Sequence, residues 1–237
     1  MGNKECEIER LVYDPYLVFY ADLGKHDGGV FQSDDAHGHV CTATGVTWGI
    51  QGGTFNGTGD IISVADSALL SFGNGTTDVA FSVVFWAKIT AATNPRFMSK
   101  GAAAKYEYTI GTDGSDHFKV QFNSGGEAVA AFLMTYVSTD VFPTGTMTMF
   151  AVTYPGDGVA ANIKVYFNKI QKVGTTAKGA TYTAMNDYDQ PLTIGKLWND
   201  SANYFTGTMD GIIFHKGRVL TSLEISNIYE ATKGRYQ

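Results

Sequence analysis

The sequence is poor in charge, in cysteine and in helix-forming residues, and these shortages exclude several classes of protein. Only 17% of its 237 residues are charged, and the formal net charge is −6. A nucleic-acid-binding domain needs a clustered basic face, which this mildly acidic sequence lacks. No apolar run approaches the roughly 20 residues of a membrane-spanning helix. We therefore expect no nucleic-acid partner and no membrane span.

Cysteine and targeting signals are equally sparse. The two cysteines, Cys6 and Cys41, leave a disulfide open, because spacing alone does not show whether their Cα atoms come within bonding reach. The first 20 residues carry several charges and contain no apolar core of a leader, so we expect no signal peptide. The location stays open, with an extracellular or virion-associated protein favoured.

Strand-forming and turn-forming residues are abundant instead. The chain has 28 glycines, 15 phenylalanines and 13 tyrosines but only seven glutamates. From residue 17 onward, short apolar runs alternate with turn clusters at the spacing of a sandwich or barrel. These features predict an all-β fold, a two-sheet antiparallel sandwich with one short C-terminal helix. We expect residues 1–15 to be a tail or peripheral strand and residues 16–237 to form one domain.

The strongest predicted strand covers residues 81–89, where apolar side chains occupy both faces. We expect this strand to lie centrally in its sheet, with one face on the core and the other lining a further feature of the molecule. Residues 106–110 and 118–122 flank a turn and predict a hairpin, as do residues 147–154 and 163–167. Residues 24–47, rich in glycine, aspartate and histidine, are predicted to be irregular.

One helix is predicted near the C-terminus. Thr221 and Glu224 have the spacing of a capping box, with Thr221 as the N-cap and Glu224 at the third helical position. Leu223, Ile225 and Ile228 supply an apolar stripe, and Gly234 is placed to end the helix.

Three stretches in order resemble strand motifs of the laminin-G-like (LamG) domains of the concanavalin-A-like lectin/glucanase superfamily. They are residues 53–64, residues 81–88, and residues 192–195 with 205–214, followed by a short helix that matches the family's. The resemblance covers roughly residues 16–236 and implies a jelly roll. The end of the chain, residues 231–236, is also similar to copies of this domain in phage and virus structural proteins.

The resemblance also implies a structural calcium ion, held by one aspartate and by main-chain carbonyls. Carried over to this sequence, the ligands would be Asp210, the carbonyl of Gly57 and a carbonyl near Asp22. Calcium binds about 6–8 oxygens, so these groups with waters would suffice. The alternative is that Asp210 hydrogen-bonds backbone amides, because a buried carboxylate among apolar neighbours must be paired, hydrogen-bonded or metal-bound.

Aromatic residues beside polar ones predict carbohydrate binding, because the C–H faces of sugars pack on rings while their hydroxyls need hydrogen-bond partners. The candidate ligand-binding residues are Trp48, Tyr106, Tyr108, Trp198, Asn199, Asp200 and Tyr204. The alternative for each aromatic residue is that it fills the core.

Catalytic signals are weak. A retaining glucanase of this fold needs two opposed carboxylates in an E-x-D-x-x-E spacing, which occurs nowhere in the sequence. Residues 166–171 resemble a strand of alginate lyases but lack its glycine and second tyrosine. The sequence therefore predicts a non-catalytic module that binds an oligo- or polysaccharide. The alternatives are a virion or appendage structural protein, which would form a symmetric oligomer, and a polysaccharide lyase.

Overall fold

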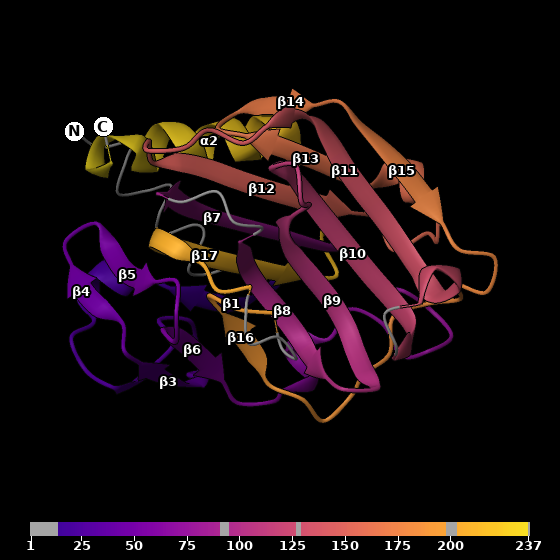
Figure 1. Cartoon of the computed structure of the whole chain (residues 1–237), viewed down its shortest axis with the longest axis horizontal. Helices are drawn as coiled ribbons and strands as arrows, with labels where there is room; N and C mark the ends of the chain where they lie inside the picture. Colours follow the sequence, from indigo (N-terminus) through magenta and orange to yellow (C-terminus); the bar gives the residue numbers. More distant parts are fainter. Residues whose placement is uncertain (1–13, 91–94, 127–128, 198–202, 237) are drawn as a thin grey trace.

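The computed structural model describes residues 14–90, 95–126, 129–197 and 203–236, and these form a sandwich of two antiparallel sheets (Figure 1). One sheet has the order β14 (Ile170–Lys172), β13 (Lys164–Phe167), β12 (Thr148–Tyr154), β7 (Phe81–Ile89), β17 (Thr206–Lys216), β5 (Gly52–Asn56) and β4 (Thr47–Gly49), with β1 (Leu17–Ala21) also paired to β17. The other has the order β15 (Gly174–Lys178), β11 (Leu133–Val141), β10 (His117–Gly126), β9 (Lys105–Thr112), β8 (Arg96–Ala102), β16 (Leu192–Ile194), β6 (Ile61–Val64), β3 (Val40–Thr44) and β2 (Val30–Gln32). The predicted all-β sandwich is confirmed, as are both predicted hairpins, β9–β10 and β12–β13.

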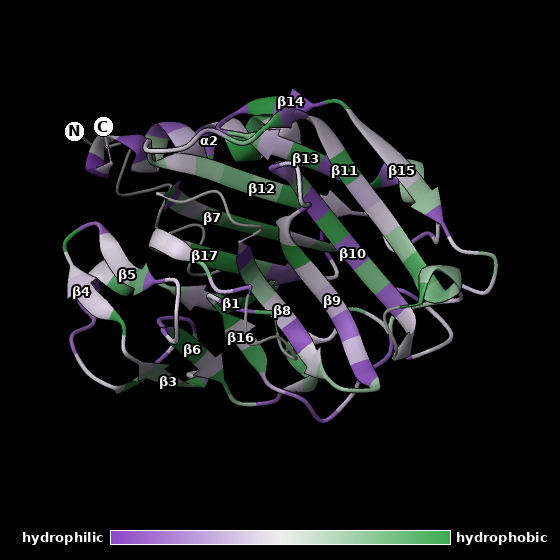
Figure 2. Ribbon diagram, viewed as in Figure 1, coloured by the Kyte–Doolittle hydropathy of each residue, from purple (hydrophilic) through white to green (hydrophobic). Residues whose placement is uncertain are grey.

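The main core lies between the two sheets and is built by side chains that alternate along each strand. In β10, Phe118, Val120 and Phe122 are fully buried, while Lys119 and Gln121 between them are only half-buried. The same alternation of hydrophobic and hydrophilic positions is visible along β10 in Figure 2. Burying large aromatic side chains supplies most of the stabilisation of such a core.

Strand β7 lies between β12 and β17, and both of its faces are buried, as predicted. Phe85 and Ala87 belong to the core between the sheets. Val84 and Trp86 point to the opposite face and join a second apolar cluster. The C-terminal helix packs on that second cluster through Ile225 and Ile228.

The covering helix, α2 (Ser222–Thr232), begins as predicted. The Thr221 side chain accepts a hydrogen bond from the Glu224 amide, and the Glu224 carboxylate accepts one from the Thr221 amide. Ile225 and Ile228 are buried, but the Leu223 side chain is 68% exposed, so its predicted place in the apolar stripe is wrong.

The α-helix ends at Thr232, with Lys233 as its C-cap directly before Gly234, which agrees with the predicted end. Helix α2 gives way to a 3-10 turn, η5 (Lys233–Arg235), which directs Tyr236 back toward the sheet. No helix among the residues described here is long and apolar enough to cross a membrane.

Residues 24–47 are more regular than predicted, since they contain the 3-10 turn η1 (Leu23–Lys25) and the strands β2 and β3. In β3 only Cys41 is fully buried, so the alternation is too short to identify the strand from sequence. Burial raises the pKa of the Cys41 thiol to about 12. The thiol is free, and Cys6 lies outside the described residues.

A buried histidine on β17 makes a pH-dependent contribution to stability. His215 is fully buried, with the Asp14 carboxylate 3.3 Å from its Nε2 atom, and burial lowers its pKa from 6.5 to about 4. Because the unfolded chain binds the proton more readily, the free energy of unfolding falls as the pH drops from 6.5 toward 4.

This contribution can be isolated with a His215→Leu variant. We expect the wild type to lose up to about 3 kcal/mol relative to this variant between pH 7 and pH 4, as measured by urea unfolding at each pH. A difference that stays constant across this range would contradict the prediction.

Candidate functional site

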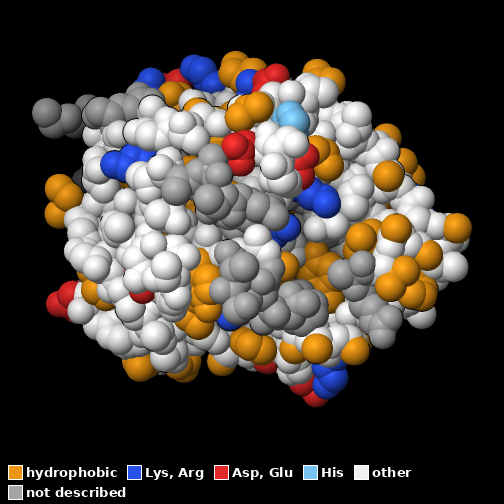
Figure 3. Space-filling view, in the orientation of Figure 1, with side chains coloured by type: hydrophobic (Ala, Val, Ile, Leu, Met, Phe, Trp, Pro, Cys, Tyr) orange, Lys and Arg blue, Asp and Glu red, His pale blue; other side chains and the backbone are white. Residues whose placement is uncertain are grey.

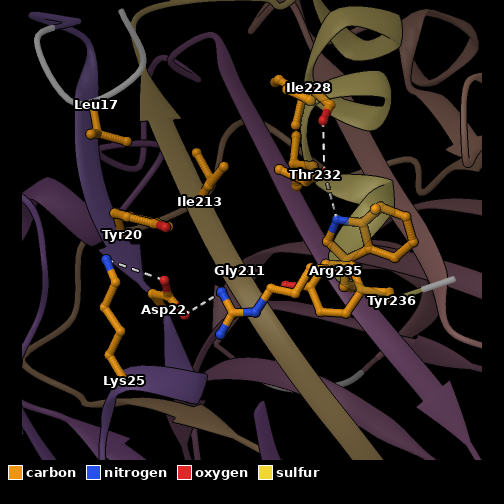
Figure 4. A pocket seen from close by; sticks show the side chains of 14 residues that line it. Leu17, Tyr20, Asp22, Lys25, Gly211, Ile213, Ile228, Thr232, Arg235 and Tyr236 are labelled. Carbon is orange, nitrogen blue, oxygen red and sulfur yellow. Dashed lines mark hydrogen bonds and ion pairs between the residues drawn. The ribbon is translucent and has the colours of Figure 1, made fainter. Parts of the chain in front are cut away.

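A cavity of about 450 Å³ lies on the outer face of the eight-stranded sheet, between β1, β17 and the C-terminal helix (Figure 4). The sheet supplies its floor, α2 and η5 supply one wall, and β1 with η1 supplies the other. The lining residues are Leu17, Tyr20, Asp22, Lys25, Val84, Trp86, Gly211, Ile213, Ile228, Ala231, Thr232, Gly234, Arg235 and Tyr236. Most of the lining is therefore aliphatic or aromatic, and the charged residues gather at one end.

The aromatic part of the cavity is organised around Trp86. Its indole Nε1–H donates a 3.0 Å hydrogen bond to Thr232 Oγ1 on α2. Its ring stacks on Tyr229 at a centroid distance of 5.7 Å and lies 4.5 Å from the ring of Tyr236. These contacts fix the helix against the sheet, and the buried Trp86 and Tyr236 form part of the cavity lining.

The charged end of the cavity is organised around Arg235. Its guanidinium lies 2.7 Å from Asp22 Oδ1 and 3.2 Å from Asp210 Oδ2, and it therefore bridges the two carboxylates. Lys25 Nζ lies 3.2 Å from the other oxygen of Asp22. Figure 4 shows Lys25, Asp22 and Arg235 linked in this order across the mouth of the cavity.

Behind this mouth, the Asp210 side chain is fully buried and fully engaged. It accepts hydrogen bonds from the Gly24 and Gly211 amides and from the Tyr236 hydroxyl. Burial raises the pKa of Asp210, while the hydrogen bond from Tyr236 and the charge of Arg235 oppose the rise. Asp210 therefore holds the end of the chain onto β17.

At the opposite wall, Tyr20 is half-buried and faces the cavity with its ring (Figure 4). Burial, and then the charge of Asp22, raise the pKa of the Tyr20 hydroxyl. The hydroxyl therefore stays protonated at neutral pH and can both donate and accept a hydrogen bond.

The predicted calcium ligands do not fit a calcium site in this geometry. Asp22 and Asp210 are brought together, but the positive charge between them belongs to Arg235. Gly57 follows Asn56, which pairs with Thr206 of β17. Since Thr206 is four strand residues from Asp210, Gly57 lies about 13 Å from Asp210 along β17. Gly57 instead makes a tight turn, with φ +81°. Calcium binding stays a prediction from the resemblance, and these contacts do not support it.

Two of the predicted ligand-binding residues are core residues. Tyr106 and Tyr108 are 3% and 1% exposed, and the Tyr108 hydroxyl donates to the Leu70 carbonyl at 2.9 Å. A ligand at the surface cannot reach rings buried to this extent. We therefore correct the prediction for these two tyrosines.

The remaining predicted residues lie at separate places. Trp48 is half-buried, with its ring edge-on to Phe31 at 5.7 Å. Tyr204 is also half-buried, with Lys196 Nζ 4.9 Å from its ring centroid. Trp48 on β4 pairs with Gly53 near the start of β5. Tyr204 lies two residues before Thr206, which pairs with Asn56 at the end of β5. Trp48 and Tyr204 therefore lie toward opposite ends of β5. Trp198, Asn199 and Asp200 lie outside the described residues.

The residues that sequence reasoning missed are Tyr20, Trp86, Arg235 and Tyr236. One signal was present in the sequence: both faces of residues 81–89 are largely apolar, so the second face was expected to line something, and Trp86 lies on that face. No local pattern marks Arg235 and Tyr236, because their partners are 25 or more positions away along the chain.

Two antiparallel sheets packed face to face form a jelly-roll sandwich. The family model for the concanavalin A-like lectin/glucanases superfamily matches residues 56–226, which is well over half of the chain. The chain belongs to this superfamily. No curated protein matches the sequence.

Several solved structures share the fold. A Trypanosoma rangeli sialidase is 13% identical with a TM-score of 0.67, over 98% of this chain and 38% of that one. Domain 4 of AbnA, an extracellular arabinanase from Geobacillus stearothermophilus, in complex with arabinotriose, is 21% identical with a TM-score of 0.60, over 90% of this chain and 98% of that one. The binding domain of botulinum neurotoxin serotype G is 15% identical with a TM-score of 0.65, over 90% of this chain and 50% of that one.

These likenesses show the fold alone. The chain spans between 34% and 38% of the length of the sialidases, so it corresponds to a part of those proteins.

Proposed function

We propose that this chain is a non-catalytic recognition module that binds a carbohydrate in the cavity between α2 and β1. The observation that carries the proposal is the lining of this cavity, in which the half-buried ring of Tyr20 lies beside a fixed set of charged groups. Its volume of about 450 Å³ falls within the range of small-ligand sites, about 300–1,000 Å³.

The chemistry of the lining suits a sugar ring. The apolar C–H face of a pyranose packs against an aromatic ring, here Tyr20. Its hydroxyls need both donors and acceptors, and the mouth offers both. Lys25 Nζ donates from a side chain that is 61% exposed. The Tyr20 hydroxyl, which stays protonated, can both donate and accept.

The same geometry argues against hydrolysis at this cavity. A glycoside hydrolase needs two carboxyl groups that both reach the substrate. Among the described residues that line the cavity, Asp22 is the one acidic residue, and Asp210 is fully buried behind it. The cavity can therefore hold a sugar without supplying the acid pair that would cleave it.

Two related structures support a carbohydrate ligand in general terms. The arabinanase domain was solved with arabinotriose, and a T. rangeli sialidase was solved with sialic acid. Their ligands say nothing about which sugar this chain would bind.

A glycan array followed by calorimetry with the best ligand tests the proposal. We expect Tyr20→Ala to weaken binding by tenfold or more, because one ring contact and hydroxyl are worth about 1.4 kcal/mol or more. Lys25→Ala should weaken it a few-fold. Tyr16→Ala is the matched control, since Tyr16 is 47% exposed and does not line the cavity.

The comparison with Tyr204→Ala separates the cavity from the site that the sequence predicted around Tyr204. Binding that survives Tyr20→Ala but is lost in Tyr204→Ala would reject the cavity as the site. A chain that binds no glycan on the array would reject carbohydrate recognition altogether.

A further inference from the structure

Strand β15 ends the nine-stranded sheet and has one unpaired edge. Within the part of the chain that the structure describes, its single strand partner is β11. The hydrogen bonds at the two ends of this pairing join Val173 to Thr139 and Gly179 to Leu133. Since antiparallel hydrogen bonding alternates along a strand, Gly174, Thr176 and Lys178 direct their backbone N–H and C=O groups toward the free edge.

The usual protection of an edge strand is missing here. Edge strands are commonly guarded by proline or by lysines that project into solvent. Strand β15 contains no proline, and Lys178 Nζ folds back to donate to the Gly158 carbonyl at 2.9 Å. Lys172, just before the strand, is paired with Asp140 at 2.9 Å. Neither lysine therefore guards the edge.

Exposed apolar side chains lie on β15 and directly before it. Val173 precedes the strand and is 73% exposed, and Ala177 is exposed on β15 itself. Figure 3 shows hydrophobic side chains gathered on the side of the molecule where Figure 1 draws β15. An unpaired strand edge flanked by exposed apolar groups is the type of surface that pairs with another strand.

We propose that two copies of this chain associate through β15, pairing antiparallel about Thr176. In this register, Thr176 lies opposite Thr176 of the second copy, and Gly174 lies opposite Lys178 of the second copy. All the outward N–H and C=O groups of β15 then find partners. The nine-stranded sheets of the two copies then form one continuous sheet. The dimer carries two cavities, one from each chain.

The strand's own sequence favours a second copy over an unrelated strand. A two-fold axis requires a strand that is complementary to itself. Each Lys178 meets a glycine, so no like charges oppose one another across the axis. Thr175 lies opposite Ala177 of the second copy, so small side chains meet on the outer face.

Sedimentation equilibrium over a range of concentrations tests the proposal. The wild type is expected to show a monomer–dimer equilibrium. Thr176→Pro should abolish it, because proline removes an N–H that points to the free edge and leaves the pairing with β11 intact. Thr176→Lys should also abolish it, by placing two lysines opposite each other. Thr176→Ala is the matched control, and it should dimerise like the wild type.

Hydrogen exchange supplies an independent readout. Raising the protein concentration should slow exchange at the amides of Gly174, Thr176 and Lys178, while those of Thr175 and Ala177 are already bonded to β11. The melting temperature of each variant checks that its monomer remains folded. A wild type that stays monomeric at every concentration, or a dimer that persists in both Thr176→Pro and Thr176→Lys, would overturn the proposal.

Discussion

Replacing Lys100 with methionine is expected to lower the free energy of unfolding by about 3–5 kcal/mol, because it leaves a buried carboxylate without its counter-charge. The Lys100 and Glu107 side chains are both fully buried, with Lys100 Nζ 2.9 Å from Glu107 Oε1. Lys100 Nζ also bonds Asp66 at 2.7 Å and the Tyr188 carbonyl at 3.1 Å. Methionine fills a similar volume, so the loss reports the charge rather than the packing.

The pH dependence of this loss identifies its cause. Burial raises the pKa of Glu107, and the charge of Lys100 opposes the rise, so removing Lys100 raises that pKa further. A carboxyl group whose pKa is higher in the folded than in the unfolded protein destabilises the fold at pH values above its unfolded pKa. At such pH values, folding must either bury the charge or take up a proton. Urea unfolding should therefore show a larger loss at pH 7 than at pH 4.

A second substitution provides the control for the Lys100→Met variant. Adding Glu107→Gln removes the uncompensated charge and should restore at least half of the lost free energy of unfolding. A double variant that is less stable than Lys100→Met alone would show that the ion pair is not the source of the effect.

The sheet architecture could be predicted from sequence because alternation, turn residues and capping act over a few positions. Residues 81–89 showed two apolar faces, and the structure buries both. The same local reasoning failed for Tyr106 and Tyr108, because composition does not say which side of a strand faces the core. Both side chains lie inside, although tyrosines beside polar residues suggested a binding surface.

The cavity was harder to predict because it depends on contacts between distant segments. Asp22 and Arg235 are at opposite ends of the chain, and they meet only because β1 pairs with β17 and η5 follows the helix. Sequence reasoning found that Asp210 needs partners and left calcium and backbone amides open as alternatives. In the structure, Asp210 accepts hydrogen bonds from two backbone amides and from Tyr236, and it lies beside the Arg235 guanidinium. A single sequence contains no signal that pairs residues across this distance.

Replacing Trp86 with alanine is expected to cost about 3–5 kcal/mol, the loss typical of a buried aromatic residue truncated to alanine. The side chain is 1% exposed and lies on the central strand β7. It also contacts α2 through Tyr229 and Thr232, so its removal takes away the main aromatic contact between the helix and the sheet. We therefore expect the substitution to accelerate hydrogen exchange more in α2 than in β7, in addition to lowering the overall free energy of unfolding.

Two milder variants divide this effect into its parts. Trp86→Phe keeps a ring but removes the indole N–H, and Thr232→Val removes the acceptor, so each should cost about 1–2 kcal/mol. The double variant should cost little more than Trp86→Phe alone if the hydrogen bond is the shared cause. If Trp86→Ala instead leaves exchange in α2 unchanged, the helix is held by Ile225 and Ile228, and the cavity wall does not depend on Trp86.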